Sequence, residues 1–297
     1  MKKNHIFDGT ATALVTPFRD GAVDYATLDA LIDRQVSFGI EALVIGGTTA
    51  EAATLSDKER YELFRHTADH VGGRCKLIFG TGTNDTKAAV RHTRMAHSLG
   101  CDGVLSVTPY YNKGTEEGLV RHYLTVADSV ELPILLYNVP SRTGVQLTER
   151  QLDRLAEHPG IVGIKEAADS SERLTMLARF GDRLSLFAGN DSQIYTVLAL
   201  GGRGVISVAS NLAPRAVDRI CRLYAAGNIK GSLQQQLRLL PLMRAMFLET
   251  NPTPIKYMMS LRGLCAAEVR LPMAEPTEAT RAAIGTLLAS TDAELLT

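Results

Sequence analysis

Short apolar runs alternate along the chain with longer stretches in which apolar residues recur at helical spacing. A continuous apolar run is typical of a strand that is buried on both faces, as in a parallel sheet. The pattern predicts eight strands, over residues 13–18, 42–47, 77–81, 103–108, 134–137, 161–165, 184–188 and 204–208.

The amphipathic stretches predict helices, among them 57–71, 86–99, 116–128 and 148–157. Ser56 with Glu59, and Thr148 with Gln151, have the spacing of a capping box, in which two side chains satisfy free N–H groups of the first turn. From about residue 212 onward the pattern is helical without further strands, over 215–226, 232–249 and 255–264.

Eight strands that alternate with helices favour a closed (β/α)8 barrel. A doubly wound open sheet is the alternative, but it usually has a glycine-rich turn after its first strand, where this chain has Thr16-Pro-Phe-Arg-Asp20. No linker or low-complexity tract interrupts the chain. We therefore expect a barrel over residues 1–225 and a C-terminal helical extension, 226–297, that packs on it.

Composition adds few constraints. The chain has 297 residues, 45% hydrophobic and 22% charged, which is typical of a soluble protein with a core. The 32 basic and 32 acidic residues balance, so no net charge indicates a nucleic acid or an anionic membrane as partner. The start lacks the apolar segment of a signal peptide, no long apolar run could span a membrane, and the four cysteines are scattered. We expect a cytoplasmic protein.

Polar residues collect where the predicted strands end. In a (β/α)8 barrel the carboxyl ends of the strands form one rim, where active sites lie. The rim here would carry hydroxyls, phenols, one amide, one lysine and one arginine: Thr48, Thr49, Tyr110, Tyr111, Tyr137, Ser141, Arg142, Lys165, Asn190 and Ser207.

Lys165 ends the sixth predicted strand. Alternation places Val162 and Ile164 on one face and Gly163 and Lys165 on the other, so the aliphatic pair would face the helices and the lysine the barrel interior. Tyr137 would point inward from the neighbouring strand. A strand-end lysine more often pairs with a carboxylate, but no evident inward acid is available here. Because burial favours the neutral form of an amine, the pattern indicates a nucleophile that forms a Schiff base.

His66 and His70 have a spacing that can hold zinc on a helix. An exposed helix face is the simpler interpretation, since the other histidines are dispersed. We predict no metal site and no cofactor.

Seven segments, in this order and spacing, resemble the dihydrodipicolinate synthase family of class I, pyruvate-dependent aldolases. They are ALVTPF at 13–18, GTTAE at 47–51, VTPYYN at 107–112, LYNVPSRTG at 136–144, GIKEA at 163–167, GVISV at 204–208 and NPTPIK at 251–256. The resemblance implies an enzyme that condenses pyruvate, bound as a lysine Schiff base, with L-aspartate 4-semialdehyde. The product would be 4-hydroxy-tetrahydrodipicolinate, in diaminopimelate and lysine biosynthesis.

The resemblance also implies the catalytic residues. Lys165 would form the imine, and Tyr137 would be the acid and base at that imine. Thr48 and Tyr111 would complete a proton relay to solvent. In the family the tyrosine that matches Tyr111 comes from the neighbouring subunit, so the partners implied are the two substrates and further copies of the chain, in a tetramer built from dimers.

The substrate-binding residues follow by the same resemblance. Thr48 and Thr49 would hold the carboxylate of pyruvate, and Arg142 would bind the carboxylate of the aldehyde, which its planar fork suits. Gly189 and Ile206 would line the site through their backbones.

Two departures from the family pattern carry expectations. Ala50 replaces a usual glycine, which costs about 1 kcal/mol if that position needs a positive φ. Ala52, Arg60 and Ala88 are among the positions where lysine-inhibited members hold lysine between subunits; Ala88 replaces the carboxylate that would pair with its amine, and Arg60 adds a like charge. We therefore expect weak or absent feedback inhibition by lysine.

Two other functions remain open. The first is another pyruvate-dependent aldolase, such as an N-acetylneuraminate lyase or a 2-keto-3-deoxy sugar acid aldolase; the SRTG segment around Arg142 argues against it. The second is an inactive barrel that senses a keto acid, which would need no proton relay.

Overall fold

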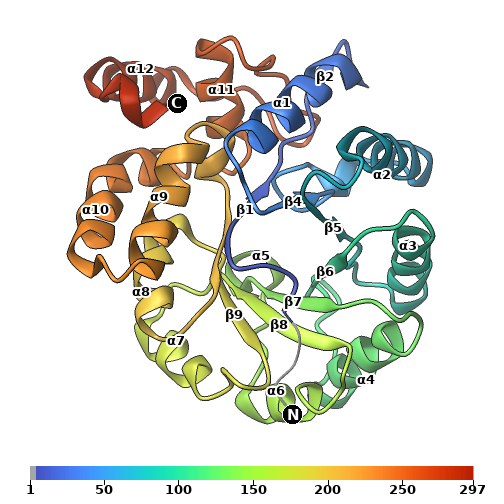
Figure 1. Cartoon of the computed structure of the whole chain (residues 1–297). Coiled ribbons are helices and arrows are strands. Elements are labelled where there is room, and N and C mark those ends of the chain that lie inside the picture. Colours follow the sequence, from blue (N-terminus) through green and yellow to red (C-terminus); the bar gives the residue numbers. More distant parts are fainter. Residues whose placement is uncertain (1–4, 297) are drawn as a thin grey trace.

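The structure is a computed structural model that describes residues 5–296. Residues 1–4 and 297 lie outside the described residues. They include the first and last residues of the two predicted regions and part of the N-terminal segment that we predict is not a signal peptide. Eight parallel strands close into a barrel in the order β1-β10-β9-β8-β7-β6-β5-β4, which confirms the predicted (β/α)8 fold (Figure 1). These strands are β1 Gly9–Ala13, β4 Ala42–Ile45, β5 Lys76–Gly80, β6 Gly103–Val107, β7 Ile134–Asn138, β8 Ile161–Glu166, β9 Ser185–Ala188 and β10 Gly204–Ser207.

Helices surround the barrel, and a short antiparallel pair, β2 Phe18–Arg19 with β3 Ala22–Val23, follows β1 (Figure 1). Both predicted capping boxes, at Ser56 and Thr148, are present. The helices up to residue 225 are α1 Tyr25–Ser37, α2 Asp57–Val71, α3 Thr86–Ser98, α4 Glu116–Ala127, α5 Pro140–Thr143, α6 Glu149–Leu155, α7 Ser171–Ala178, α8 Ile194–Ala199 and α9 Pro214–Ala225.

The first strand lies earlier than predicted. It covers Gly9–Ala13, whereas the apolar run at 13–18 forms mostly a loop that leads into β2. The apolar pattern did not predict this strand because two of its five residues are threonines. Their hydroxyls are buried and bonded, Thr12 Oγ1 donating to Gln35 Oε1 (2.8 Å) and Thr10 Oγ1 donating to Cys221 Sγ (3.7 Å).

Three further helices follow α9: α10 Ile229–Ala245, α11 Thr253–Leu261 and α12 Glu278–Ser290. The additional C-terminal helices are therefore confirmed, although α12 was not predicted. Helix α10 packs against α9, and one hydrophobic core runs from the barrel helices into α10 and α11. The division at residue 225 stays a prediction. None of the helices in residues 5–296 is long and apolar enough to cross a bilayer.

The buried residues form two layers. An inner group fills the barrel and includes Val44, Leu135, Phe187 and Ile206. A larger outer group lies between the strands and the helices. A polar side chain that points inward at the carboxyl end of a strand thus sits above a packed apolar floor, where few water molecules compete for it.

Candidate active site

Lys165 lies near the carboxyl end of β8 and points into the barrel. Its register partners are Tyr137 on β7 and Phe187 on β9, both members of the inner layer. Only 5% of its surface is exposed. The inward direction predicted from alternation is confirmed, but Val162 also belongs to the inner layer. The register of β7 and β8 shifts there, so Val162 and Ile164 do not share a face as predicted.

The amine of Lys165 lacks an acidic partner at ion-pair distance within residues 5–296. Glu166 is the next residue, but its side chain accepts hydrogen bonds from Asn138 Nδ2 (2.7 Å) and Arg173 Nε (3.0 Å). Lys165 Nζ instead lies 4.4 Å from the ring centroid of Tyr137. The interpretation of Lys165 as an ion-paired strand-end lysine therefore does not hold.

One buried acid does lie near Lys165 at this end of the barrel. Asp191 follows β9 and is fully buried, and its carboxylate accepts hydrogen bonds from the hydroxyl of Ser207 and from the backbone N–H groups of Val208 (2.9 Å) and Ala209 (3.1 Å). Burial raises the pKa of Asp191, while these hydrogen bonds and the charge of Lys165 act in the opposite direction. The charge of Lys165 thus acts on Asp191 from a distance, without a direct ion pair.

A pocket of about 150 Å³ opens beside Lys165. A second cavity of about 470 Å³ shares several of the residues that line it, among them Thr48, Tyr137 and Arg142. Of the eight predicted site residues, the smaller pocket brings together six: Thr48, Thr49, Tyr137, Arg142, Lys165 and Gly189.

The two threonines belong to the turn that follows β4. The hydroxyl of Thr49 accepts a hydrogen bond from Asn251 Nδ2 (2.9 Å), and Thr16 Oγ1 donates to the carbonyl of Ala50 (2.9 Å). The positive φ of this turn falls on Glu51, at 57°, and not on Ala50. Alanine in place of the family's glycine is therefore not strained.

Arg142 and Gly189 border the pocket from other strands. Arg142 stands in α5, directly after β7, and its Nη2 donates to the carbonyl of Asn251 (3.2 Å). A Cβ on Gly189 would lie 2.7 Å from the Cβ of Ala167 and 2.7 Å from the carbonyl oxygen of Glu166. Only glycine fits at position 189, so its backbone forms the pocket wall.

Two predicted site residues lie elsewhere. Tyr111 is 89% exposed, at φ 70°, and borders neither cavity. Ile206 is fully buried in the inner layer, below the pocket. Within residues 5–296 no hydrogen bond joins the hydroxyls of Tyr137, Thr48 and Tyr111, so a complete relay is not formed in the single chain.

Asn251 was missed as a site residue. It is buried, borders both cavities and contacts Thr49 and Arg142. It precedes α11, far from any strand end. Its NPTPIK segment contributed to the family resemblance, and this was the only signal for it in the sequence.

The three positions considered for lysine binding do not all border one cavity. Ala52 and Arg60 border the larger cavity, where Arg60 Nη2 donates to the carbonyl of Ala52 (2.8 Å). Burial lowers the pKa of Arg60, and no carboxylate in the described chain pairs with it. Ala88 is half-buried on α3, outside that cavity.

The two histidines on α2 bind carboxylates of α1. His66 Nε2 lies 2.7 Å from Asp29 Oδ1, and His70 Nε2 lies 3.0 Å from Asp33 Oδ1. Both side chains are half-buried between the helices rather than on the exposed face that we predicted.

Known proteins resemble this chain in both sequence and fold. The profile of the Dihydrodipicolinate synthetase family matches residues 6–291. A 4-hydroxy-tetrahydrodipicolinate synthase from Pelobacter propionicus is 44% identical over 96% of this chain and 99% of that protein. The structure of the synthase of that name from Methylacidiphilum fumariolicum superposes with a TM-score of 0.95 at 42% identity, covering 97% of each chain.

A third protein, described as a monomeric dihydrodipicolinate synthase variant, is 38% identical with a TM-score of 0.93, over 96% of this chain and 97% of its own. The matches extend over nearly the whole chain, and at these levels of identity they reach beyond the fold. This chain belongs to the dihydrodipicolinate synthetase family.

Proposed function

We propose that this chain is a lyase that condenses pyruvate with L-aspartate 4-semialdehyde to give 4-hydroxy-tetrahydrodipicolinate, in diaminopimelate and lysine biosynthesis. The relatives that carry this name match over almost their full length. The observation that carries the proposal is the amine of Lys165, which is buried beside a small pocket without an acid at ion-pair distance in residues 5–296.

The pocket supports Schiff-base chemistry. A neutral amine adds to the ketone of pyruvate, and loss of water gives an imine with Lys165. The imine draws electrons from the neighbouring methyl group, which loses a proton to give an enamine. The carbon of that enamine then attacks the carbonyl carbon of the aldehyde, whose oxygen takes up a proton and becomes the hydroxyl group. The amino group of the aldehyde substrate then displaces the amine of Lys165 from the re-formed imine, which closes the ring and frees the lysine.

Tyr137 is the proposed proton carrier at the imine. In water a phenol loses its proton only at about pH 10, so at neutral pH it cannot act as a base without a group that takes up its proton. A chain of hydroxyls through Thr48 to Tyr111 of the partner subunit would let the proton leave without a free phenolate. The exposed position of Tyr111 in the single chain is compatible with this role in a dimer.

Two further contacts would orient the substrates. Thr48 and Thr49 offer hydroxyls and backbone N–H groups to the carboxylate of pyruvate, next to Lys165. Arg142 would bind the carboxylate of the aldehyde at the opening of the pocket. Its presence disfavours the alternative of a sialate or sugar-acid aldolase.

Borohydride reduction in the presence of pyruvate tests the proposal directly. Reduction of the imine fixes pyruvate to the protein, which intact mass and peptide mapping detect. An adduct on Lys165, together with turnover of L-aspartate 4-semialdehyde by untreated protein in an aldehyde panel, supports the proposal. An absent adduct, or one on another lysine, contradicts it.

Arg142→Ala is expected to raise the KM for the aldehyde about 10- to 100-fold, because a charged hydrogen bond to a carboxylate is lost. The KM for pyruvate should change much less, since the threonine turn stays intact. Steady-state kinetics with each substrate varied in turn measures both values. Equal effects on the two substrates would count against the role of Arg142.

Lysine at sub-millimolar concentration is expected to leave the rate nearly unchanged. The cavity that Ala52 borders contains the buried guanidinium of Arg60, and a like charge disfavours a cationic ligand. A lysine titration of the initial rate measures this. Strong inhibition would show that an acid does receive the amine of lysine, either Glu51 at this cavity or an acid elsewhere, and would contradict the prediction.

The finer predictions belong to the same proposal. These are a homotetramer built from dimers and a cytoplasmic location. Light scattering of the purified protein measures the first.

A further inference from the structure

Glu51 closes the turn that carries the two threonines. It adopts the left-handed conformation, with φ 57° and ψ 37°, which is unfavourable for a residue with a side chain. Its N–H donates to the carbonyl of Thr48 (3.0 Å), so the turn folds back onto itself. Such a conformation persists only where its surroundings impose it.

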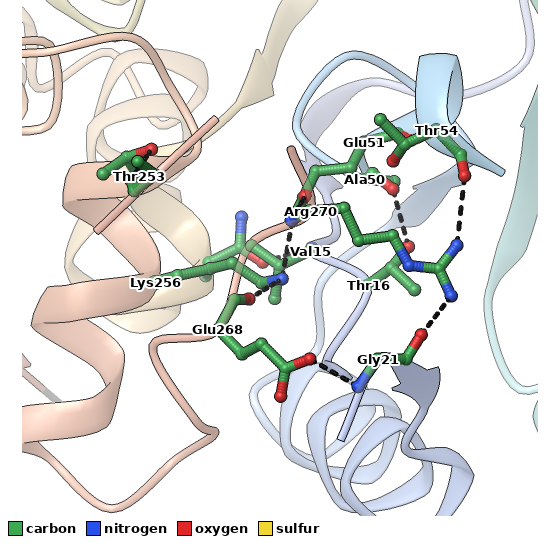
Figure 2. Close-up of polar contacts among 12 residues, drawn as sticks. Val15, Thr16, Gly21, Ala50, Glu51, Thr54, Thr253, Lys256, Glu268 and Arg270 are labelled. Atoms are coloured by element: carbon green, nitrogen blue, oxygen red, sulfur yellow. Dashed lines mark hydrogen bonds and ion pairs between the residues drawn. The ribbon is translucent and has the colours of Figure 1, made fainter. Parts of the chain in front are cut away.

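The carboxylate of Glu51 is held from the far end of the chain. Lys256 Nζ donates to Glu51 Oε1 (2.6 Å), and the backbone N–H of Arg270 donates to Glu51 Oε2 (2.9 Å). Figure 2 shows both residues reaching Glu51 from the C-terminal part of the chain. Neither charged side chain of the Glu51–Lys256 pair has any exposed surface.

The amine of Lys256 is fixed on every side. It also donates to the carbonyl of Glu268 (2.7 Å) and lies 4.3 Å from the ring centroid of Phe18. Burial lowers the pKa of Lys256, while the charge of Glu51 opposes that shift. A buried ion pair gains little net stability over an apolar pair of similar volume. Stability alone therefore gives a weak reason for this arrangement.

The same C-terminal segment contacts the candidate active site at two more points. Asn251 donates to the hydroxyl of Thr49 (2.9 Å) and accepts from Arg142 (3.2 Å). Lys256 follows five residues later, on α11. The turn is thus held at Thr49 and at Glu51 by one short piece of chain.

We propose that the Glu51–Lys256 pair positions the Thr48–Thr49 turn for the carboxylate of pyruvate. The inference rests on the proposed function, since it assumes that pyruvate is the ligand of this turn. Both members are positioning residues, because they act on the substrate through the turn and do not touch it. The C-terminal helices then form part of the pyruvate site and are more than an outer covering of the barrel.

Glu51→Gln and Lys256→Met test this in the full-length protein. Each is expected to raise the KM for pyruvate about 10- to 100-fold, because a shift of about 1 Å in a binding group has effects of this size. Borohydride trapping at sub-saturating pyruvate should slow in proportion, and the KM for the aldehyde should change much less. In the double variant the two effects should not add, since both remove one interaction.

Glu59→Gln is the matched control. Glu59 Oε1 accepts a hydrogen bond from Arg270 Nη2 (2.6 Å), so its loss also loosens the C-terminal segment. Glutamine keeps the capping box with Ser56. This variant should lower the melting temperature and leave the KM for pyruvate unchanged.

The outcomes separate the two proposals. If the wild type traps pyruvate on Lys165 while folded Glu51→Gln and Lys256→Met keep its pyruvate KM, the positioning role is wrong and the proposed function stands. If Glu59→Gln raises that KM equally, the effect is general loosening and the positioning role is again wrong. If the wild type traps no pyruvate, the proposed function itself fails. Should Lys256→Met not fold, Glu51→Gln decides, since it keeps an acceptor in place.

Discussion

Lys165→Met is expected to lower the rate of condensation by about 10⁴-fold or more, the scale on which removal of a covalent nucleophile acts. Methionine has nearly the length of lysine and retains the packing beside Phe187 and the ring of Tyr137. Only the amine is lost, and with it the imine. The initial rate and the mass of the borohydride-treated protein measure the two consequences, and no pyruvate adduct should form.

The stability of this variant should move in the opposite direction to its activity. Lys165 is buried without an acid at ion-pair distance in residues 5–296, and burial of an amine without a compensating partner costs free energy. The melting temperature of Lys165→Met should therefore equal or exceed that of the wild type. Lys87→Met, on the exposed surface of α3, is the control and should retain full activity. Substantial turnover by Lys165→Met would place the nucleophile elsewhere.

The barrel could be predicted from sequence because strands buried on both faces leave continuous apolar runs at regular intervals. The exceptions have physical causes. β1 contains two threonines whose hydroxyls are satisfied inside the protein, so it does not look apolar. Val162 lies in the inner layer and not on the helix-facing side as predicted, because the register of β7 and β8 shifts. Alternation along β8 alone cannot reveal a shift relative to β7.

The residues of the candidate site also fall into those that the sequence could predict and those that it could not. Residues at strand ends, such as Tyr137 and Lys165, could be placed together because the fold itself brings these ends to one rim. Asn251 and Lys256 could not, since their contacts with Thr49 and Glu51 join positions about 200 residues apart and leave no local pattern. Asp191 likewise stands just after a strand end, but its carboxylate accepts hydrogen bonds from the backbone that follows β10, which no local pattern predicts.

Tyr137→Phe is expected to lower kcat by about 10²- to 10⁴-fold, the usual contribution of a positioned acid or base. The substitution removes one hydroxyl and keeps the ring, which lies 4.4 Å from Lys165 Nζ. Packing and the contact between amine and ring should therefore persist, and the KM for pyruvate should change little. Proton transfer at the imine is the step that should slow. Exchange of the methyl protons of pyruvate with deuterium, followed by NMR, isolates this step from the later attack on the aldehyde.

Tyr25→Phe is the control for the loss of a phenol as such, since Tyr25 packs at a tilt against His66, with ring centroids 4.6 Å apart, and borders neither cavity. It should leave kcat unchanged. A Tyr137→Phe variant with normal kcat and a raised pyruvate KM would show that the hydroxyl binds substrate and transition state equally. Loss of exchange of the methyl protons together with normal pyruvate binding would instead support Tyr137 as the group that transfers the proton at the imine. The hydroxyl of Tyr137 has no hydrogen-bond partner within residues 5–296. If the relay runs through Tyr111 of the partner subunit, exchange of the methyl protons of pyruvate should therefore also slow when dilution separates the subunits.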